Sequence, residues 1–329
     1  MLHRSNFRPI SVLAIISKIL KRHAHSHFCT FLVEHELFTD LQFGFRWFRS
    51  CKLATLHLSD LLLANIDRGL LSGLLLVDLK KAFDLVDHDT LLIKLGMYGC
   101  CSSTLKWFRS YLTGRTQKTV FKGALSDPRP VSLGVTQGSI LGHLFFLIFI
   151  NDLPPYLIRS PDAHLTMFAD DTTPLTSRPT VQEVEARLIQ LSADMCRWAN
   201  LNKIALNAAK TKSILVTTRQ RLRHLQSPDL NVSVNFIVVE QVNSAEILDV
   251  LLDDHLTWDQ HVDCLSKTLN SRLSLLRRIS PFLDFPSSLL FHNSCIHSKL
   301  AYCSTVWGRA PGILFSAFCV ARSELLASF

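Results

Sequence analysis

Apolar side chains recur every three or four residues over much of the chain, which is the period of an amphipathic α-helix. In one such stretch, Val184, Leu188 and Leu191 fall on the same helical face. The pattern predicts helices over residues 15–36, 50–68, 90–98 and 181–200, and a further helix that ends at residue 279.

Two other segments are apolar with almost no polar interruption, as in elements that are buried on every side. Residues 73–77 begin with glycine and end at Asp78, and their length predicts a fully buried strand. Residues 140–150 follow a glycine-rich segment and predict a buried helix. The longest uninterrupted apolar stretch, residues 144–150, is far shorter than a membrane span.

A third apolar run, residues 165–169, leads into the adjacent acids Asp170 and Asp171, which two threonines follow. This order is typical of a β-hairpin whose tip carries the acids. Two neighbouring carboxylates repel each other, and a cation relieves that repulsion. A solvated turn is the alternative, because aspartate favours turns by itself. If the strand that ends at Asp78 lies beside the hairpin, three carboxylates converge and offer the oxygen ligands that Mg²⁺ prefers.

Composition places the chain among folded proteins that are not secreted. With 48% hydrophobic and 19% charged residues, 329 residues can form two or three subdomains around a sizeable core. The first residues lack the organisation of a signal peptide, and nine cysteines without a Cys-x-x-Cys pair favour reduced thiols. We therefore expect an intracellular protein, nuclear or cytoplasmic. The cluster His23, His25, His27 and Cys29 has metal-ligating residue types, but alternate spacing scatters side chains around a helix.

The formal charge of +8 suits a polyanionic partner, and its distribution strengthens this interpretation. Residues 201–224 carry six Lys and Arg side chains and no acid, while residues 101–130 carry six against Asp127 alone. Faces that serve solubility usually mix both signs, so such one-sided segments favour contact with phosphates. Solubility alone remains the alternative.

Three further segments stand in order along the chain. They are Asp78-Leu79-Lys80-Lys81-Ala82-Phe83-Asp84, Gly134-Val135-Thr136-Gln137-Gly138-Ser139-Ile140-Leu141-Gly142 and Phe168-Ala169-Asp170-Asp171, with Ile150-Asn151-Asp152-Leu153 before the third. In this order they resemble successive motifs of a reverse transcriptase, most closely of the LINE-type, non-LTR retrotransposon group. Each motif alone is moderately specific, whereas the three together are highly specific, and the resemblance extends over about residues 6 to 308.

The resemblance implies an α+β right-hand polymerase fold with an antiparallel palm sheet, helical fingers and a helical thumb. It also implies an isolated polymerase core, with any endonuclease activity outside this chain. Residues 1–255 would form fingers and palm (fingers mainly 1–70 and 88–141, palm mainly 71–87 and 142–255), residues 256–308 a thumb-like helical region, and residues 309–329 an unassigned tail.

The resemblance further implies an RNA-directed DNA polymerase that joins deoxynucleoside triphosphates to a DNA primer on an RNA template, without a membrane partner. Two Mg²⁺ ions, for which Mn²⁺ can substitute, would clamp the attacking and leaving oxygens of the phosphoryl transfer. Asp78, Asp170 and Asp171 would be their ligands and the catalytic acids, with Asp171 as the less direct one.

The same resemblance assigns the substrate side. Arg46 would contact the incoming triphosphate, Phe83 would exclude a 2′-hydroxyl, and Gln137 and Gly138 would line the nucleotide pocket. Lys210 would give a proton to the departing pyrophosphate or neutralise its charge. Without the resemblance, we would interpret Arg46 as a helix cap or ion-pair partner and Phe83 as core.

Several positions depart from the family pattern and raise an alternative, a catalytically inactive nucleic-acid-binding remnant of such an element. Pro174 lies in the strand that returns from the hairpin, where a missing N–H costs a ladder bond or shifts the tip. Asp249 stands in place of glycine and would be strained at positive φ. The other departures are Trp47, Phe48, Cys51, Thr136 and His143, the last two where proline is usual.

Overall fold

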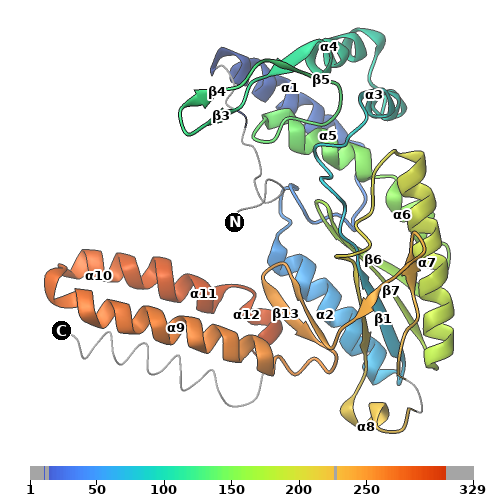
Figure 1. Cartoon of the computed structure of the whole chain (residues 1–329), viewed down its shortest axis with the longest axis vertical. Coiled ribbons are helices and arrows are strands. Elements are labelled where there is room, and N and C mark those ends of the chain that lie inside the picture. The colour runs from blue at the N-terminus through green and yellow to red at the C-terminus, as the bar shows by residue number, and fades with distance from the viewer. Residues whose placement is uncertain (1–10, 12–14, 226–227, 309–329) are drawn as a thin grey trace.

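The computed structural model describes residues 11, 15–225 and 228–308. Figure 1 shows a central sheet, a group of helices and small hairpins above it, and a long helical arm that projects to one side. These three parts are the palm, fingers and thumb, so the predicted α+β right-hand fold is confirmed. The tail at residues 309–329 lies outside the described residues.

The palm is a five-stranded sheet with β1 at its centre. The strand order is β11-β8-β1-β7-β6, and β1 runs antiparallel to both of its neighbours. The short edge strand β11 pairs parallel with β8 and is the exception to the predicted antiparallel sheet. The strands are β1 (Leu71–Leu76), β6 (Ala163–Phe168), β7 (Asp171–Arg178), β8 (Lys212–Val216) and β11 (Glu240–Gln241).

Helices cover both faces of this sheet, which explains why β1 is apolar throughout. Helix α7 (Val181–Leu201) starts with a Thr180–Glu183 capping box and lies so close to β1 that a Cβ on Gly73 would come within 2.4 Å of Val184. Helix α2 (Cys51–Asp67) packs on the opposite face, where Leu58 and Leu62 share a core with Leu74. Burial on both faces fixes the register of β1 and hence the position of the residue that follows it.

Two helices connect parts of the chain that were expected to belong to different subdomains. Helix α2, expected in the fingers, packs against the palm sheet because its apolar residues contact β1 and β6. Helix α5 (Ile140–Ile150) packs mainly against α1 (Ile15–Glu34) and α3 (His88–Met97), and its apolar side chains also belong to the same core as one face of the palm sheet. Residues 140–157 are long and apolar enough to cross a membrane, but 72% of this stretch is buried inside the protein, as in the core helix of a soluble protein.

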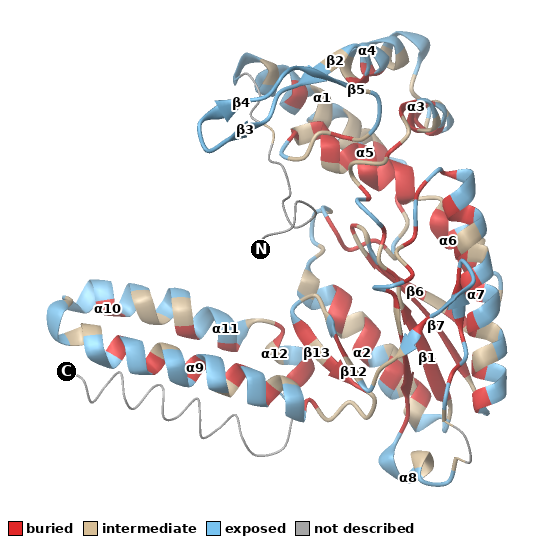
Figure 2. Ribbon diagram, in the orientation of Figure 1, coloured by how far each residue is buried: buried red, intermediate tan, exposed pale blue. Residues whose placement is uncertain are grey.

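The rest of the fingers is a small, exposed layer. Helix α4 (Ser102–Leu112) leads into the pair β2 (Arg115–Gln117) and β5 (Arg129–Val131), which encloses the hairpin β3 (Val120–Phe121) and β4 (Ala124–Leu125). Figure 2 shows these hairpins almost wholly exposed, whereas the sheet and α5 are buried. The short helix α6 (Leu153–Leu157) connects α5 to the palm.

The thumb is attached to the palm through the hairpin β12 (Ser244–Ile247) and β13 (Val250–Asp253). Its main helix, α9 (Asp259–Ile279), buries Val262, Leu265, Leu269, Leu273 and Leu276 along one face. The returning arm consists of α10 (Phe285–Phe291), a π-helical segment (His292–His297), α11 (Ser298–Ala301) and α12 (Ser304–Trp307). The remaining small elements are α8 (Arg219–Leu222), β9 (Ser233–Val234), β10 (Ile237–Val238) and a 3-10 helix (Ser280–Phe282) between α9 and α10.

Candidate active site

The strand that precedes Asp78 lies directly beside the hairpin that carries Asp170 and Asp171. The Val77 N–H donates to the Thr172 carbonyl at 3.0 Å, and these two residues form an antiparallel bridge. One step further along the same register, Asp78 lies level with Asp171. The hairpin closes at the pair Phe168–Asp171, so Ala169 and Asp170 form its tip. The strand arrangement that the sequence analysis required for convergence of the three acids is therefore present.

Asp78 is oriented by a residue that the sequence analysis did not select, Asn207. The Asn207 side-chain amide donates to Asp78 Oδ2 at 2.7 Å, and its backbone N–H donates to the Asp78 carbonyl at 2.9 Å. Asn207 lies only three residues before Lys210, which the resemblance selected. Its partner, however, lies 129 residues away, and sequence spacing does not reveal such a contact.

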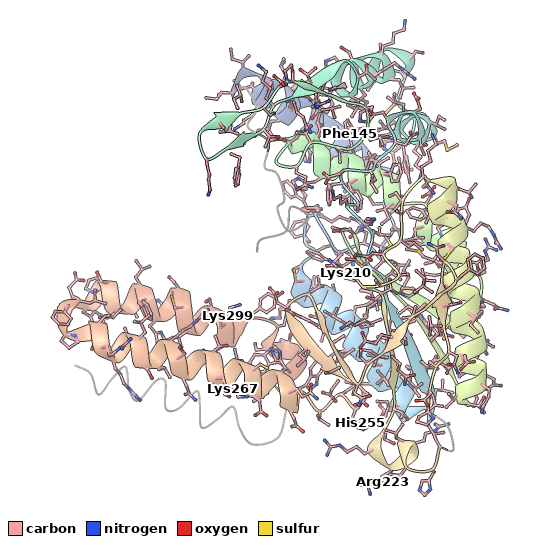
Figure 3. All side chains as sticks on the ribbon, viewed as in Figure 1. Phe145, Lys210, Arg223, His255, Lys267 and Lys299 are labelled. Carbon is pink, nitrogen blue, oxygen red and sulfur yellow. The ribbon has the colours of Figure 1, made fainter. Side chains whose placement is uncertain are left out.

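Lys210 belongs to the same turn as Asn207. Its backbone N–H donates to the Asn207 carbonyl at 3.0 Å, and its side chain is exposed. Figure 3 places Lys210 near the middle of the molecule, between the fingers that carry Phe145 and the thumb that carries Lys267 and Lys299. This turn thus orients Asp78 through Asn207 and places the Lys210 ammonium group between the fingers and the thumb.

Phe83 is part of an aromatic group rather than an isolated core residue. Its ring stacks on Phe146 with centroids 4.2 Å apart and meets the edge of Phe45 at 6.2 Å. His143 joins the group, with its ring centroid 4.2 Å from that of Phe45. Burial lowers the pKa of His143, with a smaller effect from His25, so this ring favours its neutral form in the group.

Gln137 and Gly138 are brought to Phe83 by a backbone contact between two loops. The Val135 N–H donates to the Phe83 carbonyl at 2.8 Å, and the Gln137 side-chain amide donates to Asp84 Oδ1 at 2.9 Å. Gly134 and Gly138 both have left-handed backbones, with φ of 87° and 85°. The structure therefore brings together three of the predicted nucleotide-binding residues.

Arg46 is held within its own segment. Its guanidinium donates to the Thr39 carbonyl at 2.5 Å and lies over the Phe38 ring, 5.1 Å from the centroid. Partial burial lowers its pKa, and Arg49 adds to that effect. These two contacts correspond neither to a helix cap nor to an ion pair, and neither of them brings Arg46 to Phe83 or Gln137.

The donor set has the chemistry for a hard divalent cation, since Asp78, Asp170 and Asp171 supply only carboxylate oxygens at neighbouring strand positions. Across residues 11, 15–225 and 228–308, however, no three His, Cys, Asp or Glu side chains are grouped closely enough to hold an ion. The same holds for the cluster His23, His25, His27 and Cys29, in which His23 and His27 contact each other edge to face at 4.4 Å. The three acids thus have the ligand type and the strand positions that a metal site needs, but their carboxylates are not gathered into a metal-binding group in this structure.

Pro174 interrupts the sheet beside the site but does not shift it. The β1–β7 ladder runs from Leu71–Arg178 to Leu74–Leu175 and then resumes at Val77–Thr172 in the same register. On the other side, β6 pairs with β7 without a break through Leu165–Pro174. Of the two consequences expected from Pro174, the loss of a ladder bond is observed and a shift in register is not.

Comparison with known proteins matches residues 3–250 to the family described as reverse transcriptase (RNA-dependent DNA polymerase). Among curated proteins, the chain is 29% identical over 313 residues to a probable RNA-directed DNA polymerase from transposon X-element of Drosophila melanogaster. It is 26% identical over 318 residues to the corresponding protein from transposon BS of the same organism. Each alignment covers 93% of this chain but only 33% and 34% of the relative, so the chain spans about a third of their length.

Among solved structures, the chain is similar to a telomerase from Candida albicans, solved in complex with a fragment of telomeric RNA. The TM-score is 0.50 at 14% sequence identity, and the superposition covers 95% of this chain and 56% of the telomerase chain. At this level of identity the similarity supports the fold alone.

Proposed function

The chain belongs to the reverse transcriptase (RNA-dependent DNA polymerase) family, and on that basis we propose that it synthesises DNA on an RNA template as part of a non-LTR retrotransposon. The observation that carries the proposal is the register of β1 and β7, which brings Asp78 level with Asp171. The unshifted register at Pro174 favours this activity over an inactive remnant.

Enzymes of this family use divalent metal ions. We propose that Asp78, Asp170 and Asp171 hold two Mg²⁺ ions, with Mn²⁺ as a substitute, and that the ions stabilise charge on the attacking and leaving oxygens when bound. Asn207 contributes by fixing one oxygen of Asp78, which leaves the rotation of this carboxylate restricted before any ligand arrives.

On the substrate side, Phe83 would pack against the sugar of the deoxynucleotide, because its ring is fixed by Phe146. Gln137 and Gly138 would contact the nucleotide from the adjoining loop, where Asp84 holds the Gln137 amide. Lys210 would place its ammonium group at the departing pyrophosphate. The contact of Arg46 with the triphosphate stays a prediction, since that side chain would have to leave Thr39.

RNA template and DNA primer would lie between fingers and thumb. The exposed cations of the thumb, Lys267, Arg278 and Lys299, suit a nucleic-acid backbone. Arg272 is excluded from this role in the observed conformation, because its guanidinium donates to the Cys295 carbonyl. An activity that needs RNA and deoxynucleotides also leads us to propose an intracellular location, nuclear or cytoplasmic.

The test is primer extension on an RNA template with Mg²⁺ and deoxynucleoside triphosphates, with the Asp170→Asn protein assayed in parallel. We expect extension by the native chain and none by the variant, because the substitution removes a charged metal ligand. Extension by both proteins would contradict the assigned site. Binding of the template without extension by either protein would instead identify an inactive nucleic-acid-binding remnant.

A further inference from the structure

One residue at the tip of the acidic hairpin has a backbone conformation that is intrinsically unfavourable and needs support from its surroundings. Ala169, which directly precedes Asp170, is buried and has φ of 55°, in the left-handed region. Residues with a Cβ other than asparagine and aspartate avoid this region because Cβ approaches the carbonyl oxygen, whereas glycine has no Cβ. Surrounding contacts must therefore hold Ala169 in place, and the direction in which the following acids project depends on those contacts.

The side chain of Gln42 supplies such contacts. Its Oε1 accepts the N–H groups of Ala169 and Gly44, both at 2.8 Å, and its Nε2 donates to the Ala169 carbonyl at 3.2 Å. Gln42 is only 1% exposed, so these bonds are shielded from water. One amide group thus binds both the N–H and the carbonyl of Ala169, which fixes the two peptide planes on either side of its φ and ψ.

The segment that carries Gln42 is itself joined to β6. The Phe43 N–H donates to the Met167 carbonyl at 2.8 Å, and the Met167 N–H donates to the Leu41 carbonyl at 2.9 Å. Gly44 completes the contact, since a Cβ at this position would lie 2.3 Å from the Ala169 nitrogen. The chain therefore approaches the hairpin tip at a distance that only glycine permits, and this approach brings the Gln42 amide within reach of Ala169.

We propose that Gln42 is a positioning residue for the catalytic acids: its amide locks the backbone of Ala169 and thereby sets where Asp170 and Asp171 project relative to Asp78. The inference rests on the proposed function. It assigns a role to a residue outside the three family-like motifs that contain the acids and the glycine-rich loop. Asp78 is oriented separately by Asn207, so the two halves of the site have independent supports.

The test uses Gln42→Met, which keeps the length of the side chain and removes its donor and acceptor. The matched control is Asn65→Ala, because Asn65 is also buried and its amide donates to Ser72 Oγ between α2 and β1. Three properties are compared in the full chain: the free energy of unfolding, the binding of Mn²⁺ alone by EPR titration, and kcat and KM in primer extension.

We expect both variants to be less stable than the native protein. Only Gln42→Met should also lower kcat and weaken Mn²⁺ binding, by about 10–100-fold, as is typical when the support of a metal ligand is removed. The KM for template and primer should stay at the native value in both. If Gln42→Met retained the kcat and Mn²⁺ affinity of the control, the amide would be purely structural and the proposal would be overturned.

A rescue experiment separates the backbone lock from other effects of Gln42. Glycine adopts positive φ without penalty, so Ala169→Gly in the Gln42→Met background should restore part of the lost kcat together with part of the lost stability. A kcat that the added glycine leaves unchanged would show that Gln42 does not act through Ala169.

One measurement on the native protein needs no variant. Hydrogen exchange at the Ala169 amide should be strongly protected, whereas exchange at the rate of an exposed amide would refute the lock. If the native chain failed to extend a primer, the proposed function would fail, and the Mn²⁺ and exchange measurements would still decide the role of Gln42.

Discussion

At the scale of single residues, the turn that joins β12 to β13 shows how a local departure from the family pattern acts. Leu248 and Asp249 have φ of 51° and 61°, so both central residues of this two-residue connection are left-handed. Such turns strongly favour glycine at the second position. Asp249 therefore has the positive φ at which a residue other than glycine was expected to be strained. The Tyr302 hydroxyl, which donates to the Leu248 carbonyl at 2.8 Å, helps to hold the turn.

We predict that Asp249→Gly raises the free energy of unfolding by about 1 kcal/mol, because the cost of a left-handed L-residue is removed. Urea denaturation of the two proteins measures the difference. The control is Glu246→Gly, an exposed position within the neighbouring strand, where glycine should lower stability by roughly 0.5–1 kcal/mol. A destabilised Asp249→Gly protein would contradict the assignment of strain to this residue.

Single residues also show which parts of the candidate site could be predicted from the sequence and which could not. The acids could be selected because their types and neighbours are visible along the chain, and the buried strand before Asp78 followed from its unbroken apolar run. Asn207 and Gln42 could not, because each acts through a hydrogen bond to a segment more than a hundred residues away. Arg46 was assigned a role by position, whereas the structure directs its guanidinium to Thr39.

At the scale of elements, the β1–β7 pair explains how the site tolerates a proline. In an antiparallel ladder, alternate residues direct their backbone groups to the same neighbour. The Thr172 carbonyl accepts a hydrogen bond from the Val77 N–H, so the backbone groups of residue 172 point toward the β1 side of β7. The backbone of residue 174 points to the same side, where it lies opposite Leu75. The missing N–H therefore removes a bond to β1 and leaves the β6–β7 hairpin intact.

We predict that Pro174→Val raises the free energy of unfolding by about 0.5–1.5 kcal/mol, the net value of one intramolecular hydrogen bond. Thermal or urea denaturation tests this, and hydrogen exchange at the backbone amide that the substitution introduces identifies the bond itself. Pro130→Val is the control, since Pro130 lies in the exposed strand β5, which pairs with β2 and not with the described palm strands. Equal effects of the two substitutions would indicate a general effect of proline rather than a restored ladder bond.

Helix boundaries illustrate a different limit of sequence reasoning. The predicted helices at residues 50–68, 140–150 and 181–200 agree with α2, α5 and α7 to within a residue at each end. The packing partners of these helices could not be predicted from the sequence in the same way. An apolar face indicates that a helix is buried, but it does not indicate which element the helix packs against. Helix α2 packs on the palm because Leu58 and Leu62 meet Leu74 of β1, a contact that requires the sheet to exist first.

At the scale of the whole molecule, the thumb and the palm share one core. The apolar residues of α2, one face of β1, the β12–β13 hairpin and α9 form a continuous cluster that ends at Trp307 of α12. The second cluster joins the opposite face of the sheet to α7 and to α5 of the fingers. Because the central sheet separates and contacts both clusters, loss of packing in either part reaches the strands that carry the acids.

Partly buried histidines occur in all three parts of the molecule and connect this packing to pH. Burial is the main cause that lowers the pKa of His25, His57, His143, His164 and His261 below the usual value of 6.5. His261 shows the consequence most directly, because its Nδ1 accepts the Leu251 N–H at 3.2 Å. Protonation would convert this acceptor into a donor and break the bond between α9 and β13.

The sign of the resulting pH dependence follows from proton binding. Below about pH 6.5 the unfolded chain binds protons at these histidines more readily than the folded chain, so the free energy of unfolding should fall as the pH falls from about 7 to 5. Aspartates with lowered pKa, such as Asp87 and Asp162, add a further loss only below about pH 4, as they become protonated. Urea denaturation from pH 7 to below pH 4 separates the two windows. His261→Asn offers an acceptor that does not titrate, and it should reduce the loss between pH 7 and 5. A stability that stayed constant or rose in that interval would show that the buried histidines bind protons as readily in the fold as outside it.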